Sequence, residues 1–369
     1  MPAVYHDIGK VISDRRSTLA RAIVARQYSL QPDLEGQYGP EGRARCIQDT
    51  EHHLANLSEA VSASSPALFS DYLDWAVSVL AANHIRDEDV EVNLACLQDV
   101  LLASLPGEHG IVTRRFLEEA IRCSRSASRI NASLISDEGS HPALARAYLG
   151  ALLEYNRKAA TDLILNAVDA GIPVGEIYLD VFQRCQREVG RLWQSRQIGV
   201  IQEHFATAVS QSLMARLTPM AVSEPGNGRV VMAASVGGER HEVGLRVVAD
   251  FFEMAGYEVH YFGADAPLLS VAEAMARRRP DLLLISVTMV THLSGVGKLI
   301  AAVRAREECR GVTILVGGHP FDVVPDLWRR SGADGYAADA RGALVEAERL
   351  LATRSGQKCS SSPREVLPT

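Results

Sequence analysis

The sequence lacks several features that would assign it to common classes of protein. No apolar run is long enough to cross a membrane, and the N-terminus has no basic-then-apolar leader, so we expect neither a membrane span nor secretion. The six cysteines are scattered without a CxxC pair, which argues against a zinc site or a disulfide framework and favours a reducing cytoplasm. Positive charge is not in excess: a net charge of −7 argues against a DNA-binding surface.

The apolar content is ample for a folded protein with several cores. The chain has 369 residues, of which 47% are hydrophobic, and this is enough for two or three domains. Polar, Gly- and Pro-containing stretches suggest where these domains meet. We predict a helical domain over residues 1–132, a four-helix domain over 143–219, an α/β domain over 229–352 and a disordered tail over 353–369.

Helical periodicity dominates residues 1–132. Such helices could build an orthogonal bundle or a globin-like domain, serving as a dimerisation module or holding a second ligand beside the aromatic residues Phe69, Tyr72 and Trp75. The sequence leaves these alternatives open. Helices are predicted over Ile8–Val24, Arg43–Val61, Pro66–Ala82, Val90–Leu105 and Val112–Ser128.

The next domain is predicted to contain four amphipathic helices, and the ends of the last two carry polar and aromatic residues of interest. Trp193 is followed after nine residues by Glu203 and His204. Taken alone, these residues suggest a core tryptophan at a helix end and a solvated polar pair that opens the next helix. The predicted helices are Ala143–Glu154, Arg157–Ala170, Val174–Gln194 and Val200–Leu217.

Residues 229–352 alternate apolar strands with helical patterns, which is typical of a doubly wound parallel sheet. The first strand leads into a Gly-rich loop and then a helix, the usual corner for a bound cofactor. The predicted strands are 229–235, 257–262, 281–288, 311–318 and 334–337.

The Gly-rich loop contains the pattern ExHxxG, formed by Glu239, His241 and Gly244. A histidine on a loop can give one ring nitrogen to a metal, while a carboxylate two residues earlier can hold the other ring N–H. Gly244 would let a bulky ligand approach the backbone. Downstream, Ser286, Thr288 and the pair Gly317 and Gly318 fall at carboxyl ends of strands, where such folds bind ligands.

The sequence carries ExHxxG, SxT and GG in this order, each at the end of a predicted strand. This succession of motifs resembles the cobalamin-binding domain. The resemblance implies a flavodoxin-like fold and a cofactor bound in the base-off, His-on form. His241 would be the lower cobalt ligand and Glu239 would tune it. Ser286 and Thr288 would line the slot for the displaced nucleotide tail, and Gly317 and Gly318 would let that tail pass close to the backbone.

A second resemblance covers residues 143 to about 350. The four-helix region with its Wx9EH spacing is similar to cobalamin-dependent photoreceptors related to light-responsive repressors. This implies adenosylcobalamin as chromophore, with Trp193 and Glu203 shaping the pocket of its upper group and His204 moving to cobalt after photolysis. The helical N-terminus looks like that of photocobilins, which pair cobalamin with a bilin such as biliverdin.

We therefore predict a light-sensing, cobalamin-binding signalling protein rather than an enzyme, acting as a homo-oligomer or on a partner signalling protein. An alternative is a corrinoid methyl-carrier protein of a methyltransferase system, which would not need the Wx9EH spacing. A cobalamin-binding adaptor or storage protein is a third reading.

Overall fold

The computed structural model describes residues 3–124, 133–136, 140–221 and 225–360. The chain folds into two compact units. One contains residues 1–164 and 180–209, and the other contains residues 165–179 and 210–369. Within the described ranges, none of the helices is both long and apolar enough to span a lipid bilayer.

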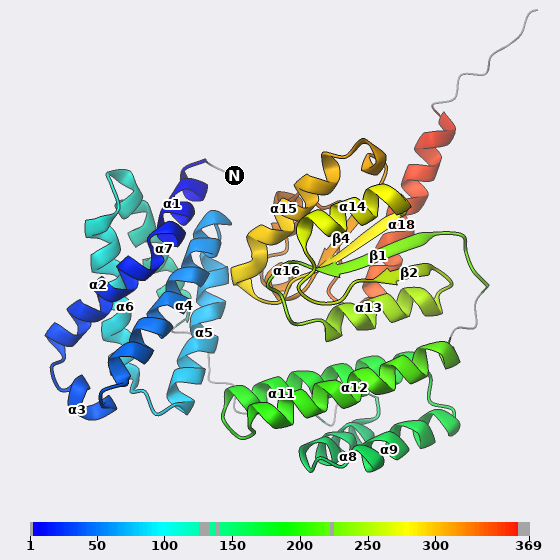
Figure 1. The fold of residues 1–369 in the computed structure, drawn as a ribbon, viewed down its shortest axis with the longest axis horizontal. Coiled ribbons are helices and arrows are strands. Elements are labelled where there is room, and N and C mark those ends of the chain that lie inside the picture. The colour runs from blue at the N-terminus through cyan, green and yellow to red at the C-terminus, as the bar shows by residue number, and fades with distance from the viewer. Residues whose placement is uncertain (1–2, 125–132, 137–139, 222–224, 361–369) are drawn as a thin grey trace, which may run out of the picture. The chain divides into compact units, whose positions relative to one another are not determined.

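The first unit begins with seven helices that pack on one another (Figure 1). Helix α4 packs against α1, α2 and α5, while α6 packs against α2 and α7. The predicted single helix Ile8–Val24 is wrong, because the chain turns at Arg15, whose guanidinium donates to the Ser104 carbonyl 2.9 Å away. The helices are α1 Ala3–Asp14, α2 Arg16–Leu30, α3 Leu34–Tyr38, α4 Gly42–Ser62, α5 Pro66–Ala82, α6 Asp87–Ser104 and α7 Glu108–Ser124.

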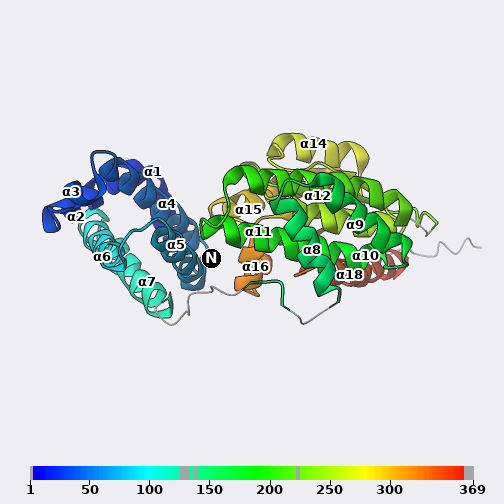
Figure 2. The same cartoon turned by 90° about the horizontal axis from the view of Figure 1, so that it is seen from below.

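The four-helix region follows the predicted pattern with one interruption. Where a single helix was predicted over Val174–Gln194, a short α-turn is followed by a π-helical segment, η1, before α11 begins. Helix α8 packs on α11, with the Cys185 thiol donating to the Ala145 carbonyl (Figure 2). The elements are α8 Pro142–Leu153, α9 Arg157–Asp169, α10 Val174–Glu176, η1 Ile177–Gln183, α11 Arg184–Gln194 and α12 Val200–Ala221.

The second unit contains a parallel sheet with strand order β2-β1-β3-β4-β5, which confirms the predicted flavodoxin-like fold. The strands are β1 Val230–Ser235, β2 Glu258–Tyr261, β3 Leu282–Ser286, β4 Thr313–Gly317 and β5 Gly335–Tyr336. The connecting elements are α13 Val243–Met254, α14 Leu268–Arg278, η2 Val290–His292, α15 Leu293–Arg304, η3 Glu307–Cys309, α16 His319–Val323, α17 Leu327–Ser331 and α18 Ala340–Ser360.

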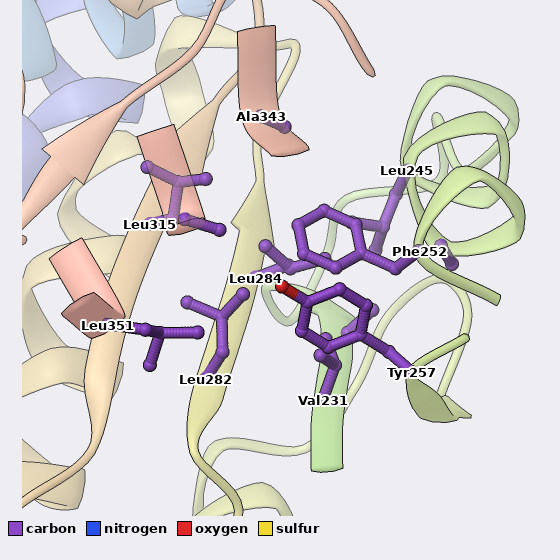
Figure 3. Packing of buried hydrophobic residues seen from close by; sticks show 12 residues of the cluster. Val231, Leu245, Phe252, Tyr257, Leu282, Leu284, Leu315, Ala343 and Leu351 are labelled. Carbon is purple, nitrogen blue, oxygen red and sulfur yellow. The ribbon is translucent and has the colours of Figure 1, made fainter. Parts of the chain in front are cut away.

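Helices α13 and α18 cover one face of this sheet, while α14 and α15 lie toward the other (Figure 1). Because both faces are covered, the central strands are almost entirely apolar. Figure 3 shows the core between the sheet and the two helices α13 and α18. Its buried members are Val231, Ala233, Leu245, Ala249, Phe252, Tyr257, Leu282, Leu284, Leu315, Ala343, Ala347 and Leu351.

Helix α18 continues to Ser360, beyond its predicted end at Leu351. Its buried residues Ala343, Ala347 and Leu351 are spaced by one helical turn and face the sheet. The remaining residues of the predicted tail, 361–369, lie outside the described residues, as do residues 137–139 and 222–224, which fall between the predicted domains.

Candidate functional site

The candidate site is built on the loop that joins β1 to α13, at the carboxyl edge of the sheet. Gly238 in this loop has φ +86°, a left-handed conformation that favours glycine, and a Cβ there would lie 3.1 Å from Nε2 of His292. The backbone N–H of Gly238 donates to Asp265 Oδ1 at 2.6 Å. The loop shape therefore depends on this glycine.

The carboxylate of Glu239 is fully buried beneath the loop, where it accepts hydrogen bonds with both oxygens. Oε1 accepts from the backbone N–H of His241 at 3.0 Å, and Oε2 accepts from the N–H groups of Thr288 and Met289 at 2.8 and 2.9 Å. Burial alone would raise the pKa of Glu239, but the hydrogen bonds from His241, Met289 and Thr288 together outweigh burial and lower it to about 2. The group is therefore an anion at neutral pH.

This anion determines how the His241 ring is presented. Nδ1 of His241 lies 2.6 Å from Oε1 of Glu239, and an ionised carboxylate can only accept, so Nδ1 carries the proton. In the neutral form of the ring, Nε2 is then the nitrogen that can act as a metal ligand. The imidazole side chain is 58% exposed, whereas its carboxylate partner is fully buried.

A second histidine, His292, contacts the same carboxylate and was missed by the sequence analysis. Its Nδ1 lies 3.4 Å from Oε2 of Glu239. His292 ends the short segment η2 that follows β3, in the loop that also supplies the Thr288 N–H. The position of a histidine six residues beyond Ser286 at a strand end was the available clue.

Small polar residues continue the core face of the sheet at this edge. In register, Ser235 pairs with Ser286, which pairs with Gly317. Because side chains alternate along a strand, these three positions lie on the face covered by α13 and α18. The Ser235 hydroxyl is buried and, within the described part of the chain, has no hydrogen-bond partner, so it could satisfy a polar group inserted at this edge.

The predicted glycine pair has a reason in the protein's own packing. Gly318 has φ +104°, and a Cβ there would lie 2.0 Å from the Val287 carbonyl oxygen. A Cβ on Gly317 would lie 2.9 Å from the Ala337 carbonyl oxygen. The ends of neighbouring strands approach too closely for side chains here. By contrast, a Cβ on Gly244 would meet nothing within 4 Å.

The remaining predicted residues belong to the other compact unit. Trp193 lies in the last turn of α11 with 43% of its surface exposed, and Glu203 lies in the first turn of α12, directly before His204. The Glu203 carboxylate accepts from the Thr207 hydroxyl at 3.1 Å and lies 3.5 Å from His204 Nε2. Within the second unit, the structure brings Glu239, His241 and Thr288 into one constellation.

The arrangement suits a metal held by one histidine. An ionised, buried carboxylate fixes the tautomer, the ring is exposed, and small residues and an unpartnered hydroxyl lie at the adjacent sheet edge. These features fit a cofactor that carries its own metal and inserts a polar tail at the edge of the sheet.

Comparisons with known proteins identify two B12 binding domains in the chain, over residues 229–345 and 144–218. The dimethylamine corrinoid protein of Methanosarcina barkeri is 32% identical over 33% of this chain, and the chain spans 57% of that relative's length. Dimethylamine corrinoid protein 3 of Methanosarcina mazei is 31% identical over 33% of this chain and 72% of its own length. The trimethylamine corrinoid protein of Methanosarcina barkeri is 22% identical over 54% of this chain and 93% of its own length.

These relatives contradict the predicted light-sensing function. They are corrinoid proteins named for dimethylamine and trimethylamine, so the assignment as a photoreceptor with a bilin chromophore and a signalling partner is wrong. The error came from the Wx9EH spacing, whose three residues occupy two helix ends. There, Glu203 bonds to Thr207 one turn along its own helix, as a polar residue in a first turn commonly does.

Proposed function

Because this chain belongs to the family of B12-binding corrinoid proteins, we propose that it binds cobalamin and carries a methyl group for a methyltransferase. The observation that carries this proposal is the buried, ionised Glu239 that holds His241 by Nδ1. The names of the relatives favour methyl transfer from methylamines over other uses of cobalamin.

In this proposal, His241 would bind the cobalt of cobalamin through Nε2. Bound cobalamin supplies a cobalt atom that can accept and release a methyl group. Glu239 keeps the proton on Nδ1 and fixes the ring plane through the contact at 2.6 Å. The N–H groups of Thr288 and Met289 keep Glu239 ionised, so the charge next to the imidazole stays constant during turnover.

The cofactor's tail would enter at the carboxyl edge of the sheet. We assign Ser286 and Thr288 to this slot, with the unpartnered Ser235 hydroxyl as a further donor or acceptor. The open surface at Gly244 would admit the bulk of the corrin, whereas Gly317 and Gly318 would let the strand ends that border the slot approach each other closely. Contacts from Trp193, Glu203 and His204 stay predictions, which substitution of each residue and a cofactor-binding titration would test.

The upper ligand distinguishes this proposal from the predicted adenosyl form. A methyl carrier takes a small upper group and exchanges it, so methylcobalamin and reduced cobalamin should bind at least as tightly as adenosylcobalamin. Titration of the apoprotein with each compound in the dark measures this. The predicted cytoplasmic location and homo-oligomeric state stay predictions.

Label transfer tests the proposed function. Protein loaded with reduced cobalamin is mixed with a methylamine methyltransferase and isotope-labelled dimethylamine, and the label on the bound cofactor is measured. We expect transfer to wild type, a loss of about tenfold or more in His241→Ala, and wild-type transfer in His260→Ala. His260 is a matched control because it lies in the same unit and contacts Glu258 at 2.9 Å. Cobalamin-loaded wild type that takes no label from mono-, di- or trimethylamine would contradict the carrier function.

A further inference from the structure

The residue directly after the proposed metal ligand collects contacts from three segments of the second unit. Glu242 is the N-cap residue of α13. Its Oε1 accepts from the Gln211 side-chain amide on α12 at 2.8 Å. Its Oε2 accepts from the Tyr261 hydroxyl at the end of β2 and from the Ala264 N–H, each at 3.1 Å.

The local backbone is shaped around this carboxylate. Gly263, which follows β2 by two residues, has φ +74°, and a Cβ there would lie 3.0 Å from Oε2 of Glu242. A glycine at this position thus lets the chain turn tightly enough for the next N–H, that of Ala264, to reach the carboxylate.

Helix α12 is attached to α13 a second time, about two helical turns further along both helices. Asp250 on α13 is buried and accepts from the Thr218 hydroxyl on α12 at 3.0 Å and from the Tyr178 hydroxyl at 2.8 Å. Arg246 Nε donates to the other oxygen of Asp250 at 2.7 Å. Both the step from Gln211 to Thr218 and the step from Glu242 to Asp250 are about two helical turns, so α12 lies along α13 and is held to it at two levels.

We propose that Glu242 is a positioning residue which, through Gln211, ties the loop bearing His241 to helix α12 and so keeps the imidazole presented for metal binding. The contacts of Asp250 hold α12 against α13. The contact between Gln211 and Glu242 then fixes the loop that bears His241 relative to α12. The residues of α12 that make these contacts, Gln211 and Thr218, belong to the same compact unit as Glu242 and Asp250. This inference rests on the proposed role of His241.

Amide hydrogen exchange in the cofactor-free protein tests the tie without relying on activity. Gln211→Leu removes the donor at nearly constant volume and should speed exchange in the loop 236–242 by about tenfold, the factor expected for losing one hydrogen bond to a charged acceptor. Gln211→Lys restores a donor and should return exchange to the wild-type rate. Glu242→Gln weakens the acceptor and should also speed exchange. Glu253→Gln, at an exposed position on α13, is the control and should change nothing.

The same variants are then loaded with cobalamin, and the histidine signature of cobalt(II) is recorded by electron paramagnetic resonance. We expect Gln211→Leu to lower the histidine-bound fraction, with recovery in Gln211→Lys. Wild-type exchange and wild-type ligation in Gln211→Leu would overturn the inference. If His241→Ala kept the histidine signature, the assignment of the cobalt ligand would fail instead, and the exchange result would still decide whether the tie exists.

Discussion

At the scale of single residues, the proposed cobalt site depends on a carboxylate that is buried and yet ionised. Isolated burial of a charge is costly, and Glu239 is tolerated because several N–H groups converge on it. The same convergence makes the residue a structural element of the loop as well as the partner of His241. A substitution should therefore affect both folding and cofactor binding.

Replacing Glu239 with Ala would leave the N–H groups of Thr288 and Met289 without their acceptor. We expect a loss of about 3 kcal/mol or more in the free energy of unfolding, at about 1–3 kcal/mol for each unsatisfied group, and a 10–100-fold weaker affinity for cobalamin. Denaturant titration and cofactor titration measure the two effects. Glu253→Ala on the exposed side of α13 is the control, and equal effects in both variants would contradict the assigned role.

A second prediction concerns the stability effect of replacing Gly318, with the helical glycine Gly297 as a matched comparison. Gly318→Ala would place a methyl group 2.0 Å from the Val287 carbonyl oxygen in a left-handed conformation, and should cost about 2 kcal/mol or more. Gly297→Ala lies in α15 with nothing within 4 Å of the new methyl group and should stabilise by up to about 1 kcal/mol. Thermal unfolding of both variants compares them; loss of stability in neither would refute the packing argument.

At the scale of elements, a buried histidine joins α4 to α5 and makes the N-terminal helices sensitive to acid. Nδ1 of His53 lies 2.8 Å from the Tyr72 hydroxyl, and the two rings meet edge to face. Burial, with a smaller effect from the neighbouring His52, lowers the pKa of His53 from 6.5 to about 4. The folded protein therefore keeps this ring neutral where the unfolded chain would protonate it.

Between pH 6.5 and about 4, the unfolded chain binds a proton that the folded chain does not, so stability should fall as the pH falls through this range. The loss is at most about 3.5 kcal/mol, since the two pKa values differ by about 2.5 units and each unit is worth about 1.4 kcal/mol. Denaturant titrations at pH 7 and pH 4.5 measure it. His53→Gln should flatten the pH dependence, whereas His52→Gln, at an exposed position, should keep it; identical profiles would refute the assignment.

The elements also show what the sequence could predict. Strands β1, β3 and β4 were evident because they are apolar runs bounded by Gly and polar residues, and Glu239 with His241 followed from local spacing. The break at Arg15 and the π-helical segment η1 were not, since both interrupt continuous helical periodicity. The contacts of Glu239 with Met289 and His292 join residues about fifty positions apart, which local patterns do not reveal.

At the scale of the whole molecule, the two compact units should respond differently to the cofactor. The proposed site lies in the unit that contains residues 210–369, so cobalamin should stabilise that unit directly. Cofactor at one hundred times its dissociation constant would add about 2.7 kcal/mol. Hydrogen exchange with and without cobalamin should show protection concentrated in residues 236–242 and 286–292, and protection confined to the N-terminal helices would contradict this site.

The most direct measurement is electron paramagnetic resonance of the cobalt(II) form of the loaded protein, prepared with ordinary and with isotope-labelled histidine. We expect a nitrogen splitting that changes with the histidine label in wild type and in His260→Ala, and that disappears in His241→Ala. A splitting that is insensitive to the histidine label, or that persists in His241→Ala, would show that His241 is not the cobalt ligand and would contradict the account at its centre.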